Sequence, residues 1–335
     1  HIPQLEEMRG SLENELRDIV AGAGENGAQE LQSMLAYQLG WEGEGASPKA
    51  QGKGIRPLLV MLTTAAAGGT WQDSLPGACA VELLHNFSLI HDDIEDQSPT
   101  RRGRPTLWKK AGLPLALNAG DAMFSLASMA LLRWEDILPP EAVIFASHRF
   151  HATCLRLTQG QHLDISFEEL NQISMEEYWR MVGGKTAALL ALSVELGAVA
   201  AAAPPPRRDH FRDFGHYLGL AYQAQDDILG IWGESSHTGK STSGDLLSGK
   251  KTLPILFGLA QDEGFTTRWK AGAIRPGEVP ELADQLEAIG ARAYTQSVTD
   301  RLTSLALDHL QQAQAEGEAG RALHVLADKL LRRQS

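Results

Sequence analysis

The spacing of apolar residues predicts helices along most of the chain. Apolar positions recur every three or four residues, and alternation of apolar and polar residues is scarce. The pattern therefore predicts an all-α fold. The expected helices cover 5–39 with a break at the glycines of 22–27, then a segment from 56 or 57, 77–96, 115–132, 140–169, 175–201, 207–232 and 254–259, with two or three more after about 277.

Loops are expected where this pattern stops. The segment 43–54 predicts a loop before a helix that has Pro57 as its first residue, a position that proline favours. The segment 233–249 is rich in Gly, Ser and Thr and predicts a mobile loop or lid. No linker divides the chain, so we expect residues 1–335 to form a single all-α domain.

Composition restricts the class of protein. With 43% hydrophobic residues in 335, the chain has enough apolar side chains for a substantial core. The net charge of -12 argues against a nucleic-acid partner. The two cysteines have no metal-ligand spacing, which favours a reduced, cytoplasmic setting. The most apolar stretch, 187–203, contains Glu195 and runs into prolines, so it predicts a buried helix and no membrane span.

Two acidic strings lie in otherwise apolar helical segments. The first reads His-Asp-Asp-Ile-Glu-Asp over 91–96, and the second reads Gln-Asp-Asp-Ile-Leu-Gly over 225–230. Carboxylates in such surroundings are costly unless cations pair with them. Asp92 and Asp96 are four residues apart and share a helix face, with Asp93 beside them. The strings predict two sets of ligands facing one cavity that holds Mg²⁺ and a diphosphate, the alternative being a solvated helix end.

Basic segments accompany these acids. Arg-Arg-Gly-Arg over 101–104 follows the first string within ten residues, and arginine forks match phosphate oxygens. Gly-Lys-Gly-Ile-Arg-Pro over 52–57 is a second candidate for anion binding, because glycines let the backbone approach a ligand and a helix N-terminus favours negative charge. Taken alone, each segment would also fit a surface loop.

Together with these strings, the basic segments resemble an ordered set of motifs of the trans-prenyl diphosphate synthases. The matching segments are 52–57, 81–96, 101–106, 184–186, 223–227 and 249–254, within a motif-bearing region of about 50–260. The resemblance implies the isoprenoid synthase fold, a bundle of antiparallel helices around a central catalytic cavity. It also implies a Mg²⁺-dependent transferase, with two or three ions, that joins isopentenyl diphosphate to an allylic diphosphate, and it implies a homodimer.

The resemblance assigns roles to particular residues. It implies that the metal ligands are Asp92, Asp93, Asp96, Asp226 and Asp227. It implies that the allylic diphosphate contacts Arg101, Lys185, Thr186, Gln223, Lys240 and Lys250. It implies that isopentenyl diphosphate is held by Lys53, Arg56, His85 and Arg102. The residues expected to act directly in catalysis are Asp92, Asp93, Asp96, Arg101, Lys185, Asp226 and Lys240.

Two features separate this chain from the common pattern or bear on its product. Gly230 stands where many family members carry the last aspartate of the second motif. Phe87 and Ser88 lie about one turn, ~5–7 Å, before Asp92, where Phe87 would form a floor and Ser88 would leave room beside it. The resemblance implies a short-chain product, with geranylgeranyl diphosphate favoured over farnesyl diphosphate. The alternatives are a non-catalytic partner subunit and a terpene cyclase.

Overall fold

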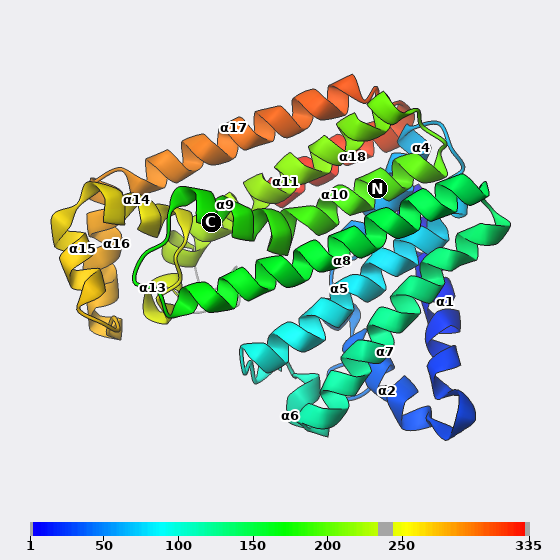
Figure 1. The fold of residues 1–335 in the computed structure, drawn as a ribbon, viewed down its shortest axis with the longest axis horizontal. Helices are drawn as coiled ribbons and strands as arrows, with labels where there is room; N and C mark the ends of the chain where they lie inside the picture. Colours follow the sequence, from blue (N-terminus) through cyan, green and yellow to red (C-terminus); the bar gives the residue numbers. More distant parts are fainter. Residues whose placement is uncertain (1–2, 234–243, 332–335) are drawn as a thin grey trace. The chain divides into compact units, whose positions relative to one another are not determined.

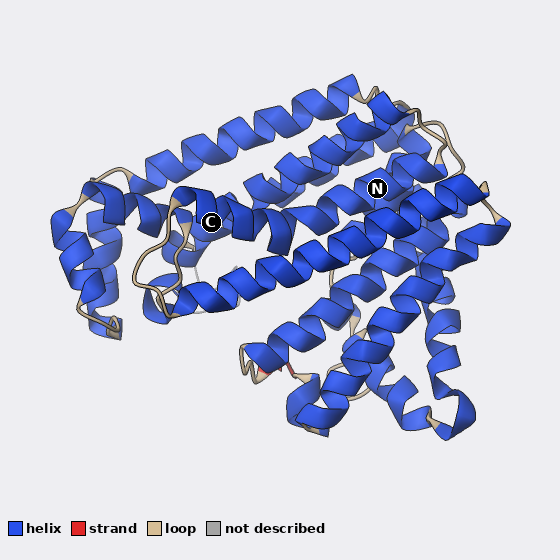
Figure 2. Cartoon of the chain, in the orientation of Figure 1, coloured by secondary structure: helices blue, strands red, loops and turns tan. Residues whose placement is uncertain are grey.

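Helices joined by short loops make up the protein. The computed structural model describes residues 3–233 and 244–331 (Figure 1). Within those ranges the only β structure is a two-stranded antiparallel hairpin (Figure 2). The all-α prediction is confirmed.

The chain divides into two compact units. The first comprises residues 1–151, 193–208 and 316–320, and the second comprises 152–192, 209–315 and 321–335. Four of the five boundaries fall inside the helices α8 (Pro140–Glu168), α10 (Ala188–Ala200), α11 (Pro205–Trp232) and α18 (Gly317–Leu331), and the fifth lies just before α18. A single domain over 1–335 stays a prediction.

The first unit is organised around α5 (Leu75–Glu95), which packs along α7 (Leu113–Leu132) and against α4 (Ile55–Ala66). Nine of the twelve residues of α4 are buried, including Leu59, Val60 and Met61, which have no exposed surface. The burial of this apolar helix fixes the position of the 52–54 segment that precedes it. The other elements here are α1 (Pro3–Ala21), η1 (Gly22–Gly27), α2 (Gln29–Gln38), α3 (Pro48–Gln51), η2 (Trp71–Ser74), β1 (Thr100–Arg101), β2 (Arg104–Pro105), α6 (Leu107–Ala111) and η3 (Arg133–Asp136).

The second unit is built on a continuous helical stretch and on most of α11. Within this unit the stretch consists of α9 (Met175–Val182), a π-helical turn η4 (Gly183–Ala187) and the first five residues of α10, whose other residues lie outside it. In the same unit α14 (Leu253–Gln261) and α16 (Val279–Ala288) both pack against α17 (Ala291–Gln312). The remaining elements are α13 (Gly244–Ser248), α15 (Glu263–Lys270) and η5 (Pro276–Glu278).

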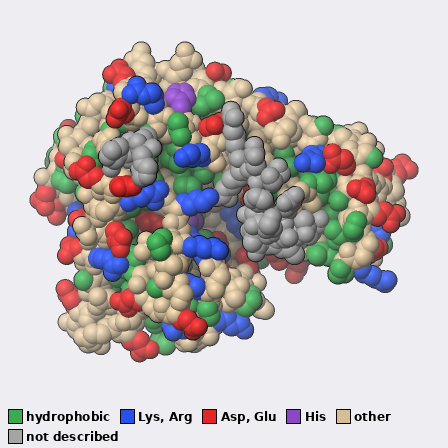
Figure 3. Space-filling view, turned by 180° about the vertical axis from the view of Figure 1, so that it is seen from behind, with side chains coloured by type: hydrophobic (Ala, Val, Ile, Leu, Met, Phe, Trp, Pro, Cys, Tyr) green, Lys and Arg blue, Asp and Glu red, His purple; other side chains and the backbone are tan. Residues whose placement is uncertain are grey.

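Two helical stretches, Leu113–Asp136 and Met175–Ala200, are long and apolar enough to cross a membrane by length and composition alone. In the second, 89% of the apolar window is buried inside the fold, as in the core helix of a soluble protein. The expectation of a buried helix in this region is therefore met. Figure 3 shows acidic and basic side chains interspersed on one face of the molecule. The acidic residues behind the net charge of -12 therefore do not form a single acidic patch on that face.

Several predicted boundaries need correction. The fourth helix begins at Ile55, so Pro57 is its third residue; proline is tolerated because first-turn N–H groups have no partner in the helix. The predicted 43–54 loop contains α3, and the 233–249 segment contains α13, while 234–243 lies outside the described residues. The hairpin and the helices α6 and α15 were not predicted. Each is at most eight residues long, too short for a periodic pattern.

Candidate active site

The first acidic motif lies at the end of α5. Asp93 is 2% exposed, whereas Asp92 is half-buried and Asp96, the C-cap residue, is exposed. Nε of Arg101 lies 2.9 Å from each carboxylate oxygen of Asp93, and its Nη2 lies 2.8 Å from Oδ1. Burial raises the pKa of Asp93, and the hydrogen bond and charge of Arg101 oppose that rise. One aspartate of the motif is thus paired inside the unit, while the other two are accessible.

The hairpin after α5 brings Arg101 back to Asp93. Arg101 pairs with Arg104 across a two-residue turn in which Arg102 has φ 53° and Gly103 has φ 78°, the left-handed backbone that tight hairpins require. Arg104 is 7% exposed, donates to three backbone carbonyls of the 37–44 segment and stacks over the Tyr37 ring. Arg104 therefore has a structural role and anchors the hairpin. Arg101 and Arg102 are the two arginines of this segment that lie at the site.

A group of cations surrounds a histidine in the same unit. Nη1 of Arg56 lies 3.2 Å from Nε2 of His85. Burial, followed by the charges of Arg56 and Arg102, holds the pKa of His85 well below its ordinary value, so His85 is neutral at pH 7. The buried Glu82 lies close enough for both arginines to oppose the rise that burial causes in its pKa. Two arginines gathered at one neutral histidine favour binding of an anion.

Arg102 also lies against the segment that precedes α4. Its Nη1 donates to the carbonyl of Ala50 at 3.0 Å, and a Cβ built on Gly52 would lie 2.6 Å from its Cζ. The carbonyl of the next residue, Lys53, accepts a hydrogen bond from Arg9. The structure therefore brings together the residues expected to bind isopentenyl diphosphate, which are Lys53, Arg56, His85 and Arg102.

Phe87 and Ser88 lie on α5 before the acidic motif, and both are half-buried. The Phe87 ring packs 4.7 Å from the His91 ring and 5.2 Å from Phe124 of α7, measured between centroids. The Ser88 hydroxyl donates to the carbonyl of His85. Phe87 is thus part of an aromatic group shared by α5 and α7, and its role in product length stays a prediction.

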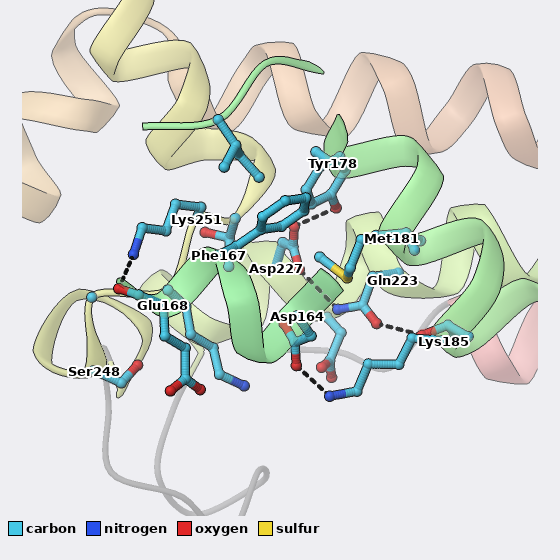
Figure 4. Close-up of a pocket in the computed structure, with 17 residues that line it drawn as sticks. Asp164, Phe167, Glu168, Tyr178, Met181, Lys185, Gln223, Asp227, Ser248 and Lys251 are labelled. Atoms are coloured by element: carbon cyan, nitrogen blue, oxygen red, sulfur yellow. Dashed lines mark hydrogen bonds and ion pairs between the residues drawn. The ribbon is translucent and has the colours of Figure 1, made fainter. Parts of the chain in front are cut away.

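The second unit contains a cavity of about 250 Å³ at the second acidic motif (Figure 4). Its walls come from α8, α9, the π-helical turn, α11 and the segment 248–252. Six of the predicted site residues line it together, namely Lys185, Thr186, Gln223, Asp226, Asp227 and Lys250.

Asp227 is the centre of a hydrogen-bond network in this cavity (Figure 4). Its Oδ2 accepts from the Tyr178 hydroxyl at 2.6 Å and from the Leu253 N–H at 2.8 Å, and its Oδ1 accepts from Gln223 Nε2 at 2.9 Å. Gln223 in turn accepts from the Thr186 hydroxyl at 3.0 Å. Burial raises the pKa of Asp227 to about 7, and burial together with the Asp227 charge raises that of Tyr178 well above its ordinary value. Tyr178 therefore remains a donor.

Lys185 lies on the π-helical turn, where its Nζ forms an ion pair with Asp164 of α8. Two glycines make this placement feasible. A Cβ on Gly160 would lie 2.8 Å from Cα of Lys185, and a Cβ on Gly184 would lie 2.7 Å from the carbonyl of Arg156. The backbones of α8 and the turn are therefore in direct contact. π-helical turns are frequent at functional sites, and this one directs Lys185 into the cavity.

The exposures of the other predicted residues differ. Asp226 and Lys250 are exposed at the cavity, whereas Asp227 is 2% exposed. Lys251, which the sequence did not single out, donates to the carbonyl of Glu168 on α8. Lys240 lies outside the described residues.

Some residues of these groups were missed at the level of sequence. Glu82 lies within the matched segment 81–96 as a charge in an apolar helix, so a signal for it existed. Tyr178 and Asp164 had no such signal, because they reach Asp227 and Lys185 from distant parts of the chain.

The aspartates of the two acidic motifs suit a Mg²⁺ site whose other ligands are waters and phosphate oxygens. In residues 3–233 and 244–331 no group of three or more His, Cys, Asp or Glu side chains could hold a metal ion by itself. Mg²⁺ usually keeps several waters and is bound by one or two carboxylates together with substrate phosphates. Asp92 and Asp96 in the first unit, and Asp226 in the second, each offer a carboxylate with exposed surface, as ligands of that kind require.

Comparison with known proteins identifies the family. Residues 46–280 match the model of the polyprenyl synthetase family. The chain is 36% identical over 315 residues to a (2E,6E)-farnesyl diphosphate synthase of Mycobacterium tuberculosis, covering 91% of this chain and 87% of that protein. It is 37% identical over 293 residues to a geranylgeranyl diphosphate synthase of the same organism, covering 85% and 83%.

A solved structure shows the same fold. The polyprenyl synthetase from Streptomyces coelicolor A3(2) superposes with a TM-score of 0.85 at 33% identity, over 97% of this chain and 98% of that one. The motif order, the helical fold and these relatives agree. This chain belongs to the polyprenyl synthetase family.

Proposed function

We propose that this prenyltransferase condenses isopentenyl diphosphate head-to-tail with an allylic prenyl diphosphate and makes geranylgeranyl diphosphate. The observation that carries the proposal is the arrangement of cations in each unit. Arg56 and Arg102 gather at a neutral His85 in the first unit, and Lys185 and Lys250 line the cavity of the second. Such groups bind anions in a chain whose net charge is -12.

Isopentenyl diphosphate is held in this proposal by the first unit's cations. Arg56 and Arg102 offer guanidinium forks to phosphate oxygens, and the neighbouring Lys53 adds a point charge. His85 is neutral and therefore serves as a hydrogen-bonding partner. Glu82, buried close to the arginines, keeps them oriented.

In this proposal, as the family resemblance implies, the residues assigned to the allylic diphosphate are Arg101 of the first unit, Lys185, Thr186, Gln223 and Lys250 at the cavity of the second, and Lys240. The carboxylates of Asp92, Asp96 and Asp226 would hold two or three Mg²⁺ ions. When bound, Mg²⁺ stabilises the negative charge on the departing diphosphate.

The sequence also assigned Asp93 and Asp227 to the metal. The oxygens of Asp93 already pair with Arg101, and those of Asp227 accept three hydrogen bonds. We therefore propose that they keep Arg101 and Gln223 in position.

The reaction breaks the allylic C–O bond and forms a C–C bond. The double bond of isopentenyl diphosphate attacks the allylic cation, and the released diphosphate takes the proton that is then lost. Cations that are already positioned at the departing oxygens lower the barrier without reorganising. Apolar side chains exclude water, which would otherwise capture the cation.

Product length is the least constrained part of the proposal. Relatives named as farnesyl and geranylgeranyl diphosphate synthases are 36% and 37% identical to this chain, so identity does not separate them. We favour geranylgeranyl diphosphate because the small Ser88 lies beside Phe87 on α5 and leaves room for a longer chain. A farnesyl product is the second candidate, supported by the aromatic pair of Phe87 with Phe124.

We also propose a cytoplasmic homodimer.

The test is an assay of the purified chain with Mg²⁺, isopentenyl diphosphate and, in turn, dimethylallyl, geranyl and farnesyl diphosphates, with products read by mass spectrometry. The expected product has twenty carbons. Turnover without isopentenyl diphosphate would indicate a terpene cyclase. Activity that appears only after mixing with a second synthase chain would indicate a partner subunit.

A further inference from the structure

A second cavity, of about 710 Å³, lies in the second unit between α8, α9, the π-helical turn and α11. Its volume is in the range of sites that bind small organic ligands. The lining residues that determine its chemistry are Arg156, Leu163, Trp179, Arg180, Gly183 and His216. Among the described residues, none lines both this Arg156 cavity and the cavity at the second acidic motif, the Asp227 cavity. The two cavities are therefore separate.

The two cavities lie on opposite faces of one helical stretch. From α9 and the π-helical turn, the Asp227 cavity is lined by residues 178, 181, 182, 185 and 186, and the Arg156 cavity by residues 179, 180, 183 and 184. With 3.6 residues per turn, the centres of these two sets lie roughly half a turn apart around the helix axis. Only the thickness of that helix separates the Arg156 cavity from Lys185.

Arg156 makes this cavity suited to an anion. It lies exposed on α8 and forms no hydrogen bond or ion pair within residues 3–233 and 244–331. Burial, followed by the charge of Arg156, lowers the pKa of His216, so His216 is neutral at pH 7 and can serve as a hydrogen-bonding partner. Asp213, which also acts on His216, is already paired with Arg212 at 3.0 Å. The Arg156 charge is thus available to a ligand.

A second cation and apolar surface lie at the same cavity. Arg180 is held by an exposed ion pair with Glu176 at 2.7 Å, a kind of contact that contributes little and is readily exchanged. The half-buried Leu163 and Trp179 line the cavity beside it. A Cβ built on Gly183 would meet no atom of the described residues within 4 Å, so the space there is open. Guanidinium forks beside apolar side chains suit a diphosphate with an apolar body.

We propose that the Arg156 cavity is a regulatory site for a prenyl diphosphate, the class of molecule that the proposed reaction makes. The identity of the ligand rests on the proposed function. The site is distinct from those that hold the two substrates.

Two contacts connect this cavity to the Asp227 cavity. The backbone of Gly160, which lines the Arg156 cavity, is in direct contact with the backbone of Lys185. The ring of Trp179 packs 4.8 Å from the ring of Tyr178, whose hydroxyl donates to Asp227 (Figure 4). A ligand in the Arg156 cavity would therefore act on Lys185 and on the Asp227 network, and we expect it to lower kcat.

The first measurement is inhibition by added geranylgeranyl diphosphate, with the allylic substrate varied. Binding at the Asp227 cavity raises the KM of that substrate, whereas binding at the Arg156 cavity lowers kcat. Arg156→Ala should weaken the effect on kcat roughly tenfold, as for a lost hydrogen bond to a charged group, and leave the uninhibited rate unchanged. Arg156→Lys keeps the charge without the fork and should recover part of the effect. Arg301→Ala, at an exposed arginine with no ion pair in the described ranges, is the matched control and should behave as the wild type.

Gly183→Leu tests the cavity without changing a charge. Its side chain would enter the open space, so the effect of geranylgeranyl diphosphate on kcat should be lost. Geranylgeraniol, which lacks the diphosphate, and inorganic diphosphate, which lacks the chain, should each leave kcat unchanged. The proposal is overturned if inhibition of the wild type is purely competitive, if the effect on kcat survives both Arg156→Ala and Gly183→Leu, or if either partial ligand reproduces it.

Equilibrium dialysis with labelled geranylgeranyl diphosphate separates this inference from the proposed function. The wild type should bind one more equivalent per chain than Arg156→Ala does. If the wild type makes no prenyl product but binds that additional equivalent, the proposed function alone fails. If the wild type is active and binds no more ligand than Arg156→Ala, the inference alone fails.

Discussion

The hydroxyl of Tyr178 provides a sharp test of the Asp227 network, because Tyr178→Phe removes one donor and leaves the ring. Tyr178 is 1% exposed and donates to Oδ2 of Asp227 at 2.6 Å. A hydrogen bond to a charged group contributes ~1.5–3 kcal/mol. Oδ2 keeps the Leu253 N–H, and Gln223 still binds Oδ1, so the carboxylate is not left unpaired. We therefore expect the lower end of that range, about 1.5 kcal/mol.

Tyr178→Phe should also lower catalytic activity, because Asp227 would hold Gln223 less firmly. Asp227 holds its amide so that Gln223 and Thr186 line the cavity in a fixed orientation. A loss of about 1.4 kcal/mol corresponds to tenfold in an equilibrium constant, so kcat/KM for the allylic substrate should fall roughly tenfold. The KM for isopentenyl diphosphate should stay unchanged, because Arg56, His85 and Arg102 are untouched.

The assay combines urea unfolding with steady-state kinetics at pH 8, above the pKa of about 7 of Asp227. Tyr294→Phe is the matched control. Its ring stacks on Phe257, and its hydroxyl makes no hydrogen bond among residues 3–233 and 244–331. The reasoning is refuted if Tyr178→Phe and Tyr294→Phe are indistinguishable both in stability and in the allylic kcat/KM.

Three further predictions concern other parts of the molecule. The pKa of His85 is lower in the folded state than the ordinary 6.5, so its contribution to stability is present above pH 6.5 and is lost below it by about 1.4 kcal/mol per pH unit. Urea unfolding at pH 7.5 and pH 5.5 should show a smaller loss for His85→Gln than for the wild type, and equal losses would contradict this. Phe87→Ala removes the aromatic contact with Phe124 and should yield a longer product, which mass spectrometry would detect. An unchanged product spectrum would show that Phe87 does not control product length. Asp226→Asn should cut turnover at least ~100-fold, and near-normal rates would exclude it as a metal ligand.

The long helices were predictable because each repeats an apolar face over many turns. The expected 115–132, 140–169 and 207–232 match α7, α8 and α11 to within two residues at each end. Short elements carry no such repeat. The hairpin at Thr100–Pro105 depends on two residues with positive φ, one of them the non-glycine Arg102, which a sequence does not reveal.

The π-helical turn could not be predicted for a different reason. Residues 183–187 continue a helical pattern, and the extra residue in the turn is stabilised by contact with Gly160 of α8. That contact is tertiary. Without the ordered set of motifs, Lys185 and Thr186 would have been interpreted as ordinary helix residues.

The acidic motifs show the same limit at the site. Spacing identified the aspartates, but it did not separate accessible Asp226 from buried Asp227, which accepts hydrogen bonds from two other segments and from Gln223 of its own helix. Nor did it show that Gly230 lies against the side chain of Asp245, fifteen residues later in the chain. Exposure and partners of a carboxylate are set by the packing of elements around it, and local sequence does not encode them.

The central claim is that this chain joins five-carbon units to an allylic diphosphate. Its most direct test is incorporation of labelled isopentenyl diphosphate into an extractable prenyl product, with geranyl diphosphate and Mg²⁺ present and the released diphosphate counted. The account predicts one diphosphate released for each five-carbon unit added, and no product when isopentenyl diphosphate is omitted. A folded protein that incorporates no label with any allylic primer would contradict it.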